Sequence, residues 1–129
     1  MAKHFLTVGE YIIKKSTIPK AGNGAFTEVF LPKGTVIGHY RGKKLNKKQY
    51  DNLKNDNYTW ELSKPNGGFF YIDAAHKKNS NWLRYINDAK NDYKNNLEPY
   101  QYRQKLYYRT TKNIQPGKEL FISYGDEYW

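Results

Sequence analysis

The chain has 129 residues, contains no cysteine and carries a formal net charge of +10. This length suits one domain with a single hydrophobic core. The lack of cysteine excludes a disulfide framework, a cysteine zinc cluster and a thiol nucleophile, and no apolar run approaches the roughly 18 residues of a membrane span. The N-terminus also lacks the apolar segment of a secretory signal. We therefore expect one intracellular domain over residues 1–129, complete in itself and without membrane contact.

The positive charge is densest in one short stretch that contains Lys43, Lys44, Lys47 and Lys48. One interpretation is a solvated lysine-rich surface that keeps the protein soluble. The other is a surface that attracts DNA, RNA or a nucleosome. Abundant Lys, Asn and Tyr also follow from an AT-rich genome, so composition does not decide between the two.

The first half of the chain alternates short apolar runs with turn signals. Residues 4–20 predict one or two short strands, and residues 35–41 predict another. The A-G-N-G segment at 21–24 has two glycines around an asparagine, which favours a tight turn but also lets the backbone approach a ligand closely. Residues 31–34 read L-P-K-G, a turn. Asn46 can cap a short helix.

The middle of the chain predicts a hairpin followed by a short helix. Two β-prone runs, 58–62 and 69–73, flank the turn sequence P-N-G-G. Near Asn81 a short helix places apolar side chains at spacings of three and four, as core packing requires. Residues 88–99 are polar and are predicted to form a long surface loop.

The last third of the chain predicts a second hairpin. Residues 106–111 and 119–124 are two apolar runs, and they flank a Q-P-G-K sequence at 115–118 that fits a type II turn. Many short strands separated by turn signals are typical of a mainly β domain.

Taken together, the order of these short motifs resembles a known family. The motifs are A-G-N-G-A-F, H-Y-R-G, Y-T-W, Y-I-D, N-W-L-R-Y-I-N, Y-Y-R-T, P-G-K-E-L and Y-G-D-E-Y. This order resembles the SET domain of protein-lysine methyltransferases that use S-adenosylmethionine, and within it the PR/SET branch. The resemblance covers about residues 16 to 128. It implies a mainly β SET-domain (β-clip) fold of short strands and small sheets, with a few short helices. It also implies a C-terminal pseudoknot, in which the last segment threads under the loop after Asn87.

The resemblance also implies a cofactor site without a metal. The positions that match cofactor-binding residues are Gly22, Asn23, Gly24, Tyr58, Asn87 and Asp88. Backbone groups of the glycine loop would hold the methionine end of S-adenosylmethionine, and Asn87 would contact it through its amide. Most SET domains have His where this chain has Asp88, and PR domains often have Cys. A negative charge there is unexpected, although the family contact is largely through the backbone.

Tyr124 matches the active-site tyrosine of the family. The positions that match the lysine channel and the strand pairing with the substrate peptide are Tyr40, Thr59, Trp60, Glu61 and Tyr108. A tyrosine has a pKa of about 10 and is a poor base at neutral pH, so we expect Tyr124 to orient the substrate amine. From the residues alone, packing is the favoured explanation of Tyr124, and the resemblance reverses that preference. Packing explains Tyr40 and Tyr108 nearly as well as channel lining does, and Glu61 fits a solvated surface acid.

Two functions follow. The first is an S-adenosylmethionine-dependent protein-lysine N-methyltransferase acting on histone tails or another Lys-rich protein, in the nucleus (its own or a host's) if the substrate is histone and otherwise in the cytoplasm. The alternative is a non-catalytic PR-type module that binds a peptide or nucleic acid. Further partners would be a nucleosome on the basic surface and a second subunit in a homodimer. Because only five residues follow Tyr124, Trp129 or that second subunit would close the cofactor pocket.

Overall fold

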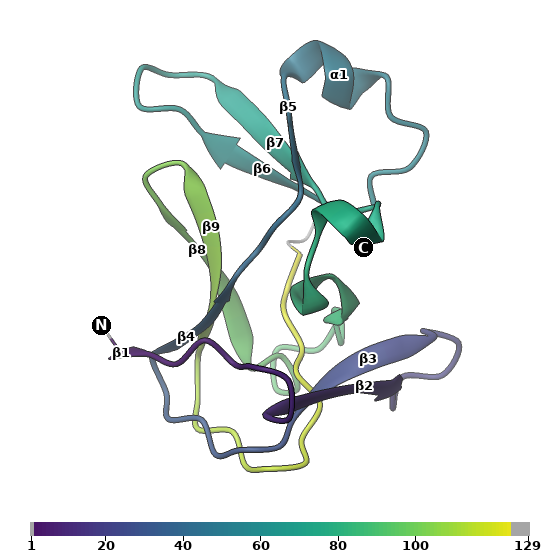
Figure 1. Ribbon diagram of the computed structural model, residues 1–129, viewed down its shortest axis with the longest axis vertical. Coiled ribbons are helices and arrows are strands. Elements are labelled where there is room, and N and C mark those ends of the chain that lie inside the picture. Colours follow the sequence, from purple (N-terminus) through teal and green to yellow (C-terminus); the bar gives the residue numbers. More distant parts are fainter. Residues whose placement is uncertain (1, 125–129) are drawn as a thin grey trace.

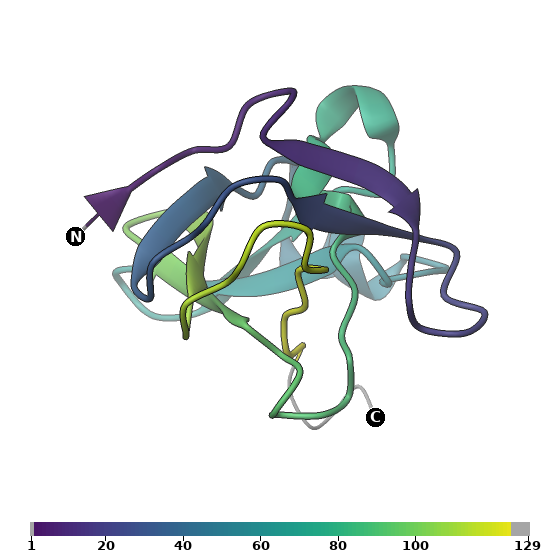
Figure 2. The same ribbon diagram turned by 90° about the horizontal axis from the view of Figure 1, so that it is seen from below.

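The computed structural model of the chain describes residues 2–124. Short strands dominate it, and the helices are single turns (Figures 1 and 2). The elements in chain order are β1 (Ala2–Lys3), β2 (Tyr11–Lys15), β3 (Asn23–Thr27), β4 (Thr35–His39), β5 (Lys43–Leu45), α1 (Lys47–Asp51), β6 (Thr59–Ser63), β7 (Phe69–Asp73), the 3-10 helices η1 (Lys77–Asn79) and η2 (Trp82–Tyr85), β8 (Leu97–Tyr102) and β9 (Lys105–Thr110).

The strands form small sheets that share one core. The orders are β1-β4-β9-β8, β2-β3 and β5-β7-β6. The buried side chains that join them include Ile37 of β4, Leu62 of β6 and Leu83 of η2. The predicted mainly β architecture is therefore confirmed. Within residues 2–124, no helix is both long and apolar enough to cross a membrane.

Two local predictions are confirmed in detail. Strands β6 and β7 pair antiparallel, from Thr59 opposite Asp73 to Ser63 opposite Phe69. Their turn needs two glycines because Gly67 and Gly68 both have positive φ, at +89° and +82°. Helix α1 begins after Asn46, whose side chain accepts the Gln49 N–H while the Gln49 side chain accepts the Asn46 N–H. That reciprocal pair is a capping box.

The predicted hairpin of residues 106–111 and 119–124 is wrong. Strand β9 pairs instead with β4 on one side and β8 on the other. The turn at 115–118 exists, with Gly117 at a φ of +87°, but it packs against β3: the Gly117 N–H donates to the Thr27 carbonyl at 2.7 Å. The predicted surface loop at 88–99 is also too long, because β8 begins at Leu97.

The C-terminal segment pairs with two separate parts of the chain. The Ile122 N–H donates to the Asn87 carbonyl at 3.0 Å, and the Leu97 N–H donates to the Phe121 carbonyl at 3.0 Å. The Asn96 side chain adds two more bonds, to the Glu119 carbonyl and the Phe121 N–H. The segment therefore lies between Asn87 and Leu97, enclosed by the loop that joins them, as a pseudoknot requires. In Figure 1 it is the yellow trace that rises through the centre of the fold.

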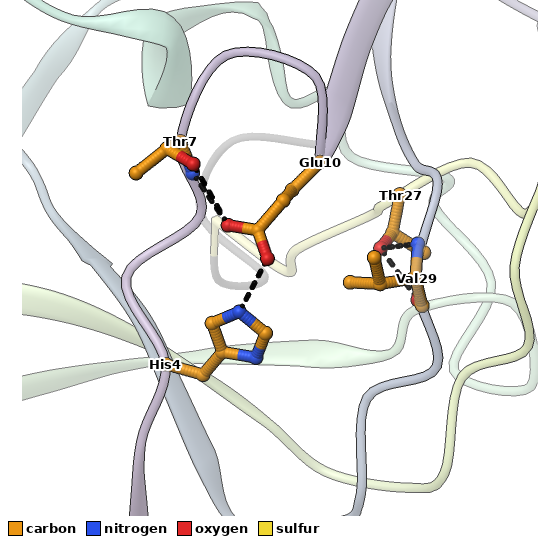
Figure 3. Close-up of polar contacts among 5 residues, drawn as sticks. All are labelled: His4, Thr7, Glu10, Thr27 and Val29. Atoms are coloured by element: carbon orange, nitrogen blue, oxygen red, sulfur yellow. Dashed lines mark hydrogen bonds and ion pairs between the residues drawn. The ribbon is translucent and has the colours of Figure 1, made fainter.

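Residues 4–7, part of the segment 4–20 expected to form one or two strands, lie outside the strands and are held by both backbone and side-chain bonds. Backbone bonds to β4 continue past β1, because the Leu6 N–H donates to the Ile37 carbonyl at 3.0 Å. The chain then turns, and the Glu10 carboxylate accepts from the Thr7 N–H and hydroxyl and contacts His4 Nε2 at 2.7 Å (Figure 3). These bonds close the turn that leads into β2.

Candidate active site

A cavity of about 590 Å³ lies where the β2–β3 loop, β6, η2 and the C-terminal segment meet. Its lining residues are Ala21, Gly22, Asn23, Asn57, Tyr58, Thr59, Trp60, Lys77, Arg84, Tyr85, Asn87 and Tyr124. Positions far apart in sequence thus converge on one space. Seven of the twelve residues expected at a cofactor, substrate or catalytic position line it, namely Gly22, Asn23, Tyr58, Thr59, Trp60, Asn87 and Tyr124.

The glycine loop forms one wall of this cavity, and its two glycines have different roles. Gly22 has a φ of +74°, a backbone conformation that favours glycine. Gly24 is buried beneath the loop, and a Cβ there would collide with the Glu119 carboxylate. Asn87 Nδ2 donates to the Asn23 carbonyl at 2.9 Å, which ties the loop to the pseudoknot. Gly22 therefore exposes its backbone to the cavity, while Gly24 allows the strand to pack closely against Glu119.

The buried side chain of Glu119 supports the same loop from below. Its carboxylate accepts from the Ser16 hydroxyl at 2.7 Å, the Thr17 N–H at 2.8 Å and the Thr17 hydroxyl at 2.6 Å. Sequence reasoning missed this role, because the acid in P-G-K-E-L follows a lysine and resembles a surface residue, and its partners lie more than 100 positions away. Charge-assisted bonds of this kind are stronger than neutral ones, so Glu119 fixes the position of the loop.

Tyr124 enters the cavity from the C-terminal segment and is held at two points. Its hydroxyl donates to the Ile86 carbonyl at 2.6 Å, and its backbone N–H donates to Asp88 Oδ2 at 2.9 Å. Its ring meets the Trp60 ring edge-on, with 5.3 Å between centroids. Burial, followed by the charge of Asp88 and the proximity of Tyr58, raises the pKa of Tyr124 well above its usual value. The hydroxyl is therefore protonated at neutral pH.

Asp88 does not line the cavity but positions residues around it. Besides the Tyr124 N–H, its carboxylate accepts the Lys90 N–H at 2.7 Å and Asn95 Nδ2 at 3.3 Å. A carboxylate is an acceptor with two oxygens. Here Oδ1 holds the loop after Asn87 together, and Oδ2 connects that loop to the C-terminal segment. This gives a physical reason for an acid at position 88. Direct contact between Asp88 and a cofactor stays a prediction.

Tyr40 and Tyr108 lie behind Trp60 and do not line the cavity. Trp60 Nε1 donates to the Tyr108 hydroxyl at 2.8 Å, and the Tyr40 hydroxyl donates to the Tyr58 carbonyl at 2.7 Å. The two tyrosine rings stack with 5.4 Å between centroids. Burial raises the pKa of both tyrosines. They form a second layer that fixes Trp60 and Tyr58, and their place in a lysine channel stays a prediction.

Strand β6 presents an edge beside the cavity. The sheet order β5-β7-β6 leaves one side of β6 without a neighbouring strand in its sheet. Near its end, the side chain of Gln101 bonds both the Ser63 N–H, at 3.0 Å, and the Ser63 carbonyl, at 2.7 Å. Thr59 lines the cavity, whereas Glu61 is exposed and accepts from the Tyr71 hydroxyl at 3.3 Å. An edge of this kind can accept an added strand.

Arg84 is the most informative residue that sequence reasoning did not assign to the site. Its Nε donates to the Ala74 carbonyl at 2.8 Å and its Nη2 to the Ala75 carbonyl at 3.0 Å. The guanidinium lies 4.3 Å from the centre of the Tyr58 ring. With Lys77 it makes the cavity cationic, since the lining contains no carboxylate among residues 2–124. An arginine within the aromatic W-L-R-Y helix was the signal.

Metal ligation finds no support in the described part of the chain, where no three His, Asp or Glu side chains come together as a metal site would need. The predicted closing residue Trp129 lies outside the described residues. The four lysines of the basic patch are exposed on β5 and α1, away from the cavity lining, and Lys47 contacts Asp51 at 2.6 Å.

Comparisons with known proteins agree on one family. The family model described as "PR domain zinc finger protein 2, PR domain" matches residues 11–129. The chain is 40% identical over 116 residues to the histone-lysine N-methyltransferase set-17 of Caenorhabditis elegans, covering 90% of this chain and 41% of that protein. It is 38% identical to human histone-lysine N-methyltransferase PRDM7, covering 90% of this chain and 23% of that protein. The chain thus spans less than half the length of these relatives.

Solved structures show the same likeness in three dimensions. The methyltransferase domain of human PR domain-containing protein 2 has a TM-score of 0.78 and 32% identity, covering 97% of this chain and 90% of that chain. The SET domain of the RIZ1 tumor suppressor (PRDM2) has a TM-score of 0.73 and 36% identity, covering 92% of this chain and 71% of that chain. A ctPRC2 structure bound to S-adenosylmethionine shares the fold, with a TM-score of 0.72 at 24% identity, over 98% of this chain and 16% of that one. The chain therefore belongs to the PR-domain branch of the SET-domain family.

Proposed function

We propose that this protein is an S-adenosylmethionine-dependent protein-lysine N-methyltransferase acting on a histone tail or another Lys-rich protein. The observation that carries the proposal is the convergence of the Gly22–Asn23 backbone, Asn87 and Tyr124 on one cavity. Relatives of similar sequence are named histone-lysine methyltransferases, which supports the same reaction and, with a histone substrate, a nuclear location.

The cavity fits S-adenosylmethionine by the chemistry of its lining. Gly22, Asn23 and Asn87 would offer backbone and amide groups to its polar ends. Lys77 and Arg84 would attract its carboxylate, because Arg84 has five N–H donors and uses Nε and Nη2 for backbone carbonyls. The faces of Tyr58 and Trp60 would attract its cationic sulfonium. When bound, the cofactor supplies a methyl group on that sulfonium sulfur.

The residues of the site would then align the acceptor and keep it reactive. Transfer would require a neutral lysine amine, because only an unprotonated nitrogen has a free lone pair with which to take up the methyl group. A cationic cavity favours the neutral amine, since nearby positive charge lowers the pKa of an ammonium group. Holding the two reacting atoms in line supplies much of the acceleration.

Tyr124 would orient the amine. Its raised pKa keeps the hydroxyl protonated, and its bond to the Ile86 carbonyl fixes where the hydroxyl oxygen lies. An oxygen held in this way can accept an N–H of the amine and direct the lone pair. A neutral tyrosine does not remove the proton, so we assign Tyr124 positioning and electrostatic stabilisation.

The substrate peptide would pair with the edge of β6. Main-chain bonds to an edge strand give affinity, and adjacent pockets give specificity. Thr59 and Trp60 carry that edge past the cavity, which would place a lysine side chain near Tyr124.

Transfer of radiolabel from S-adenosylmethionine to core histones tests the proposal, with mass spectrometry of the labelled product. We expect incorporation with the wild type and on the order of a hundredfold lower rate with Tyr124→Phe, as when one transition-state donor is removed. Tyr93→Phe is the matched control, because Tyr93 is 92% exposed. Cofactor binding without transfer to histones or to any lysate protein would favour the non-catalytic module instead.

A further inference from the structure

The outer face of the β1-β4-β9-β8 sheet lies on the side of β9 away from the candidate active site. Along β9 the side chains alternate: Leu106, Tyr108 and Thr110 are buried, while Tyr107 and Arg109 are partly exposed. Tyr108 contacts Trp60 of the cavity, so its neighbours Tyr107 and Arg109 point the other way. This face has no role in the proposed methyl transfer.

Aromatic rings form a connected row across this face. Phe5 lies 6.1 Å from Tyr107, Tyr107 lies 6.5 Å from Tyr100, and Tyr100 lies 6.5 Å from Tyr102, measured between ring centroids. Phe5 is 44% exposed and Tyr102 is 50% exposed. A shallow hollow of about 310 Å³ opens beside the row and is lined by Lys3, Val36, Tyr100, Tyr102 and Tyr107. Large apolar surface rarely stays exposed without a partner.

Positive charge accompanies the rings. The side chains of Lys3, Lys105 and Arg109 belong to the strands, and Arg103 belongs to the β8–β9 turn. Two guanidinium groups lie over rings of the row, Arg109 at 4.3 Å from Tyr100 and Arg103 at 5.3 Å from Tyr102.

Little negative charge opposes these cations. Glu98 is the one acid within the four strands, and it is paired with Arg109 at 3.0 Å. The electrostatic potential around His39, which lies beside Tyr107, is positive. Burial lowers the pKa of His39, and the positive charges of Arg41 and Lys105 lower it further.

We propose that this sheet face binds single-stranded nucleic acid. Unpaired bases would stack on Phe5, Tyr100 and Tyr102, and the backbone phosphates would contact the surrounding lysines and arginines. A sheet that presents aromatic rings flanked by cations is a platform for unpaired bases, and each stacked base contributes about 1–3 kcal/mol. In a duplex each base is stacked between its neighbours, so its faces are not available to these rings. A protein partner fits less well, because lysine is depleted at protein interfaces, whereas Lys3 and Lys105 belong to this face.

Fluorescence anisotropy of a labelled oligothymidylate of about 12 nucleotides, a length within the usual range of site sizes, tests this. The wild type should bind it more tightly than a duplex of the same length. The double variant Phe5→Ala with Tyr102→Ala should lose about tenfold or more in affinity, since two stacking rings are removed. Both side chains are about half exposed, so folding should persist, which circular dichroism checks. Tyr93→Ala removes an exposed tyrosine from another loop and should bind like the wild type.

A salt titration separates phosphate contacts from stacking. For a single strand, each phosphate contact contributes about 0.7 to the slope of log affinity against log salt. Changing Lys3 and Lys105 to Ser should therefore reduce that slope by about 1.4. Methyl transfer should be unaffected by either set of changes, because these residues lie outside the cavity.

Three results would overturn the proposal. The first is equal affinity for strand and duplex. The second is a loss of binding that follows only the change of Lys43, Lys44, Lys47 and Lys48 to Ser, which would assign nucleic-acid binding to the basic patch. The third is absence of oligonucleotide binding together with self-association that Tyr102→Ala abolishes, which would assign the face to a second copy of this chain.

Discussion

Tyr107 and Tyr108 are neighbours in sequence and lie on opposite faces of β9. Inside, the hydroxyl of Tyr108 accepts from Trp60, and the ring is 1% exposed. The hydroxyls of Tyr40 and Tyr124 are likewise fixed by backbone carbonyls. Outside, Tyr107 joins a row of rings whose ends are about half exposed. The same residue type is thus fixed through its hydroxyl in the core, and presents its ring to solvent on the outer face.

Replacing an inner ring should cost far more stability than replacing an outer one. Tyr108→Ala should lower the free energy of unfolding by about 3–5 kcal/mol, because it leaves a cavity and removes the partner of Trp60 Nε1. Tyr102→Ala should change it by less than about 0.5 kcal/mol. Urea unfolding of both variants measures the difference. Equal losses would show that the row on the outer face is part of the core.

Asp88→Ala should remove the hydrogen bond that holds the backbone of Tyr124 in place. The carboxylate accepts the Tyr124 N–H, so its loss should lower the free energy of unfolding by about 2 kcal/mol and reduce the methyl-transfer rate. Asp88→Asn keeps only one oxygen acceptor and places an amide N–H against the donors on the other side, so it should recover only part of each loss. Urea unfolding and kcat measured in parallel test this. If Asp88→Ala left kcat at the wild-type value, Asp88 would have no positioning role.

Tyr108→Phe keeps the inner ring and removes one hydroxyl. Trp60 Nε1 would lose its acceptor, which should lower stability by about 1 kcal/mol. If that hydroxyl restricts the space of a methylated amine through Trp60, products should shift toward higher methylation while activity persists. Mass spectrometry of product states over time reads this out. Unchanged product states would show that Tyr108 contributes only to packing and does not limit the degree of methylation.

A smaller effect should appear in alkaline solution. Burial raises the pKa of Tyr124 in the folded protein above the value of about 10 expected for the unfolded chain. The unfolded state therefore loses this proton first, so the contribution to stability is present below about pH 10 and is lost as pH rises further. Tyr124→Phe should show a smaller fall in stability than the wild type across that range. Parallel pH curves from thermal unfolding would contradict this.

Local chemistry made part of this structure predictable. The helix cap at Asn46 and the glycine turn of the β6–β7 hairpin depend on residues close in sequence, and both predictions are confirmed. The β8–β9 hairpin was missed because its two-residue turn contains Arg103 at a φ of +58°, where glycine or asparagine is the usual signal. Asn95 and Asn96 look like loop residues, yet they are buried. The Asn95 side chain bonds Ala89 within its own loop, and the Asn96 side chain bonds Glu119 and Phe121 of the C-terminal segment.

The candidate site likewise contains residues that the sequence could assign and residues that it could not. The glycine loop, Asn87 and Tyr124 could be assigned by resemblance, because each occupies a recognisable motif. The supports of these residues could not be assigned, since Glu119 and Asp88 act through partners that only the fold brings near. Arg84 was not assigned to the site, because the pattern of the aromatic W-L-R-Y helix around it favours core packing.

Calorimetric titration of the protein with S-adenosylmethionine, with a metal chelator present, tests the central claim most directly. The claim is that one cavity, built from the Gly22–Asn23 loop, Asn87 and Tyr124, holds this cofactor without a metal. We predict one-site binding with chelator present, weakened by Asn87→Ala and nearly unchanged by Tyr124→Phe. No heat and no thermal shift at millimolar cofactor would contradict the account.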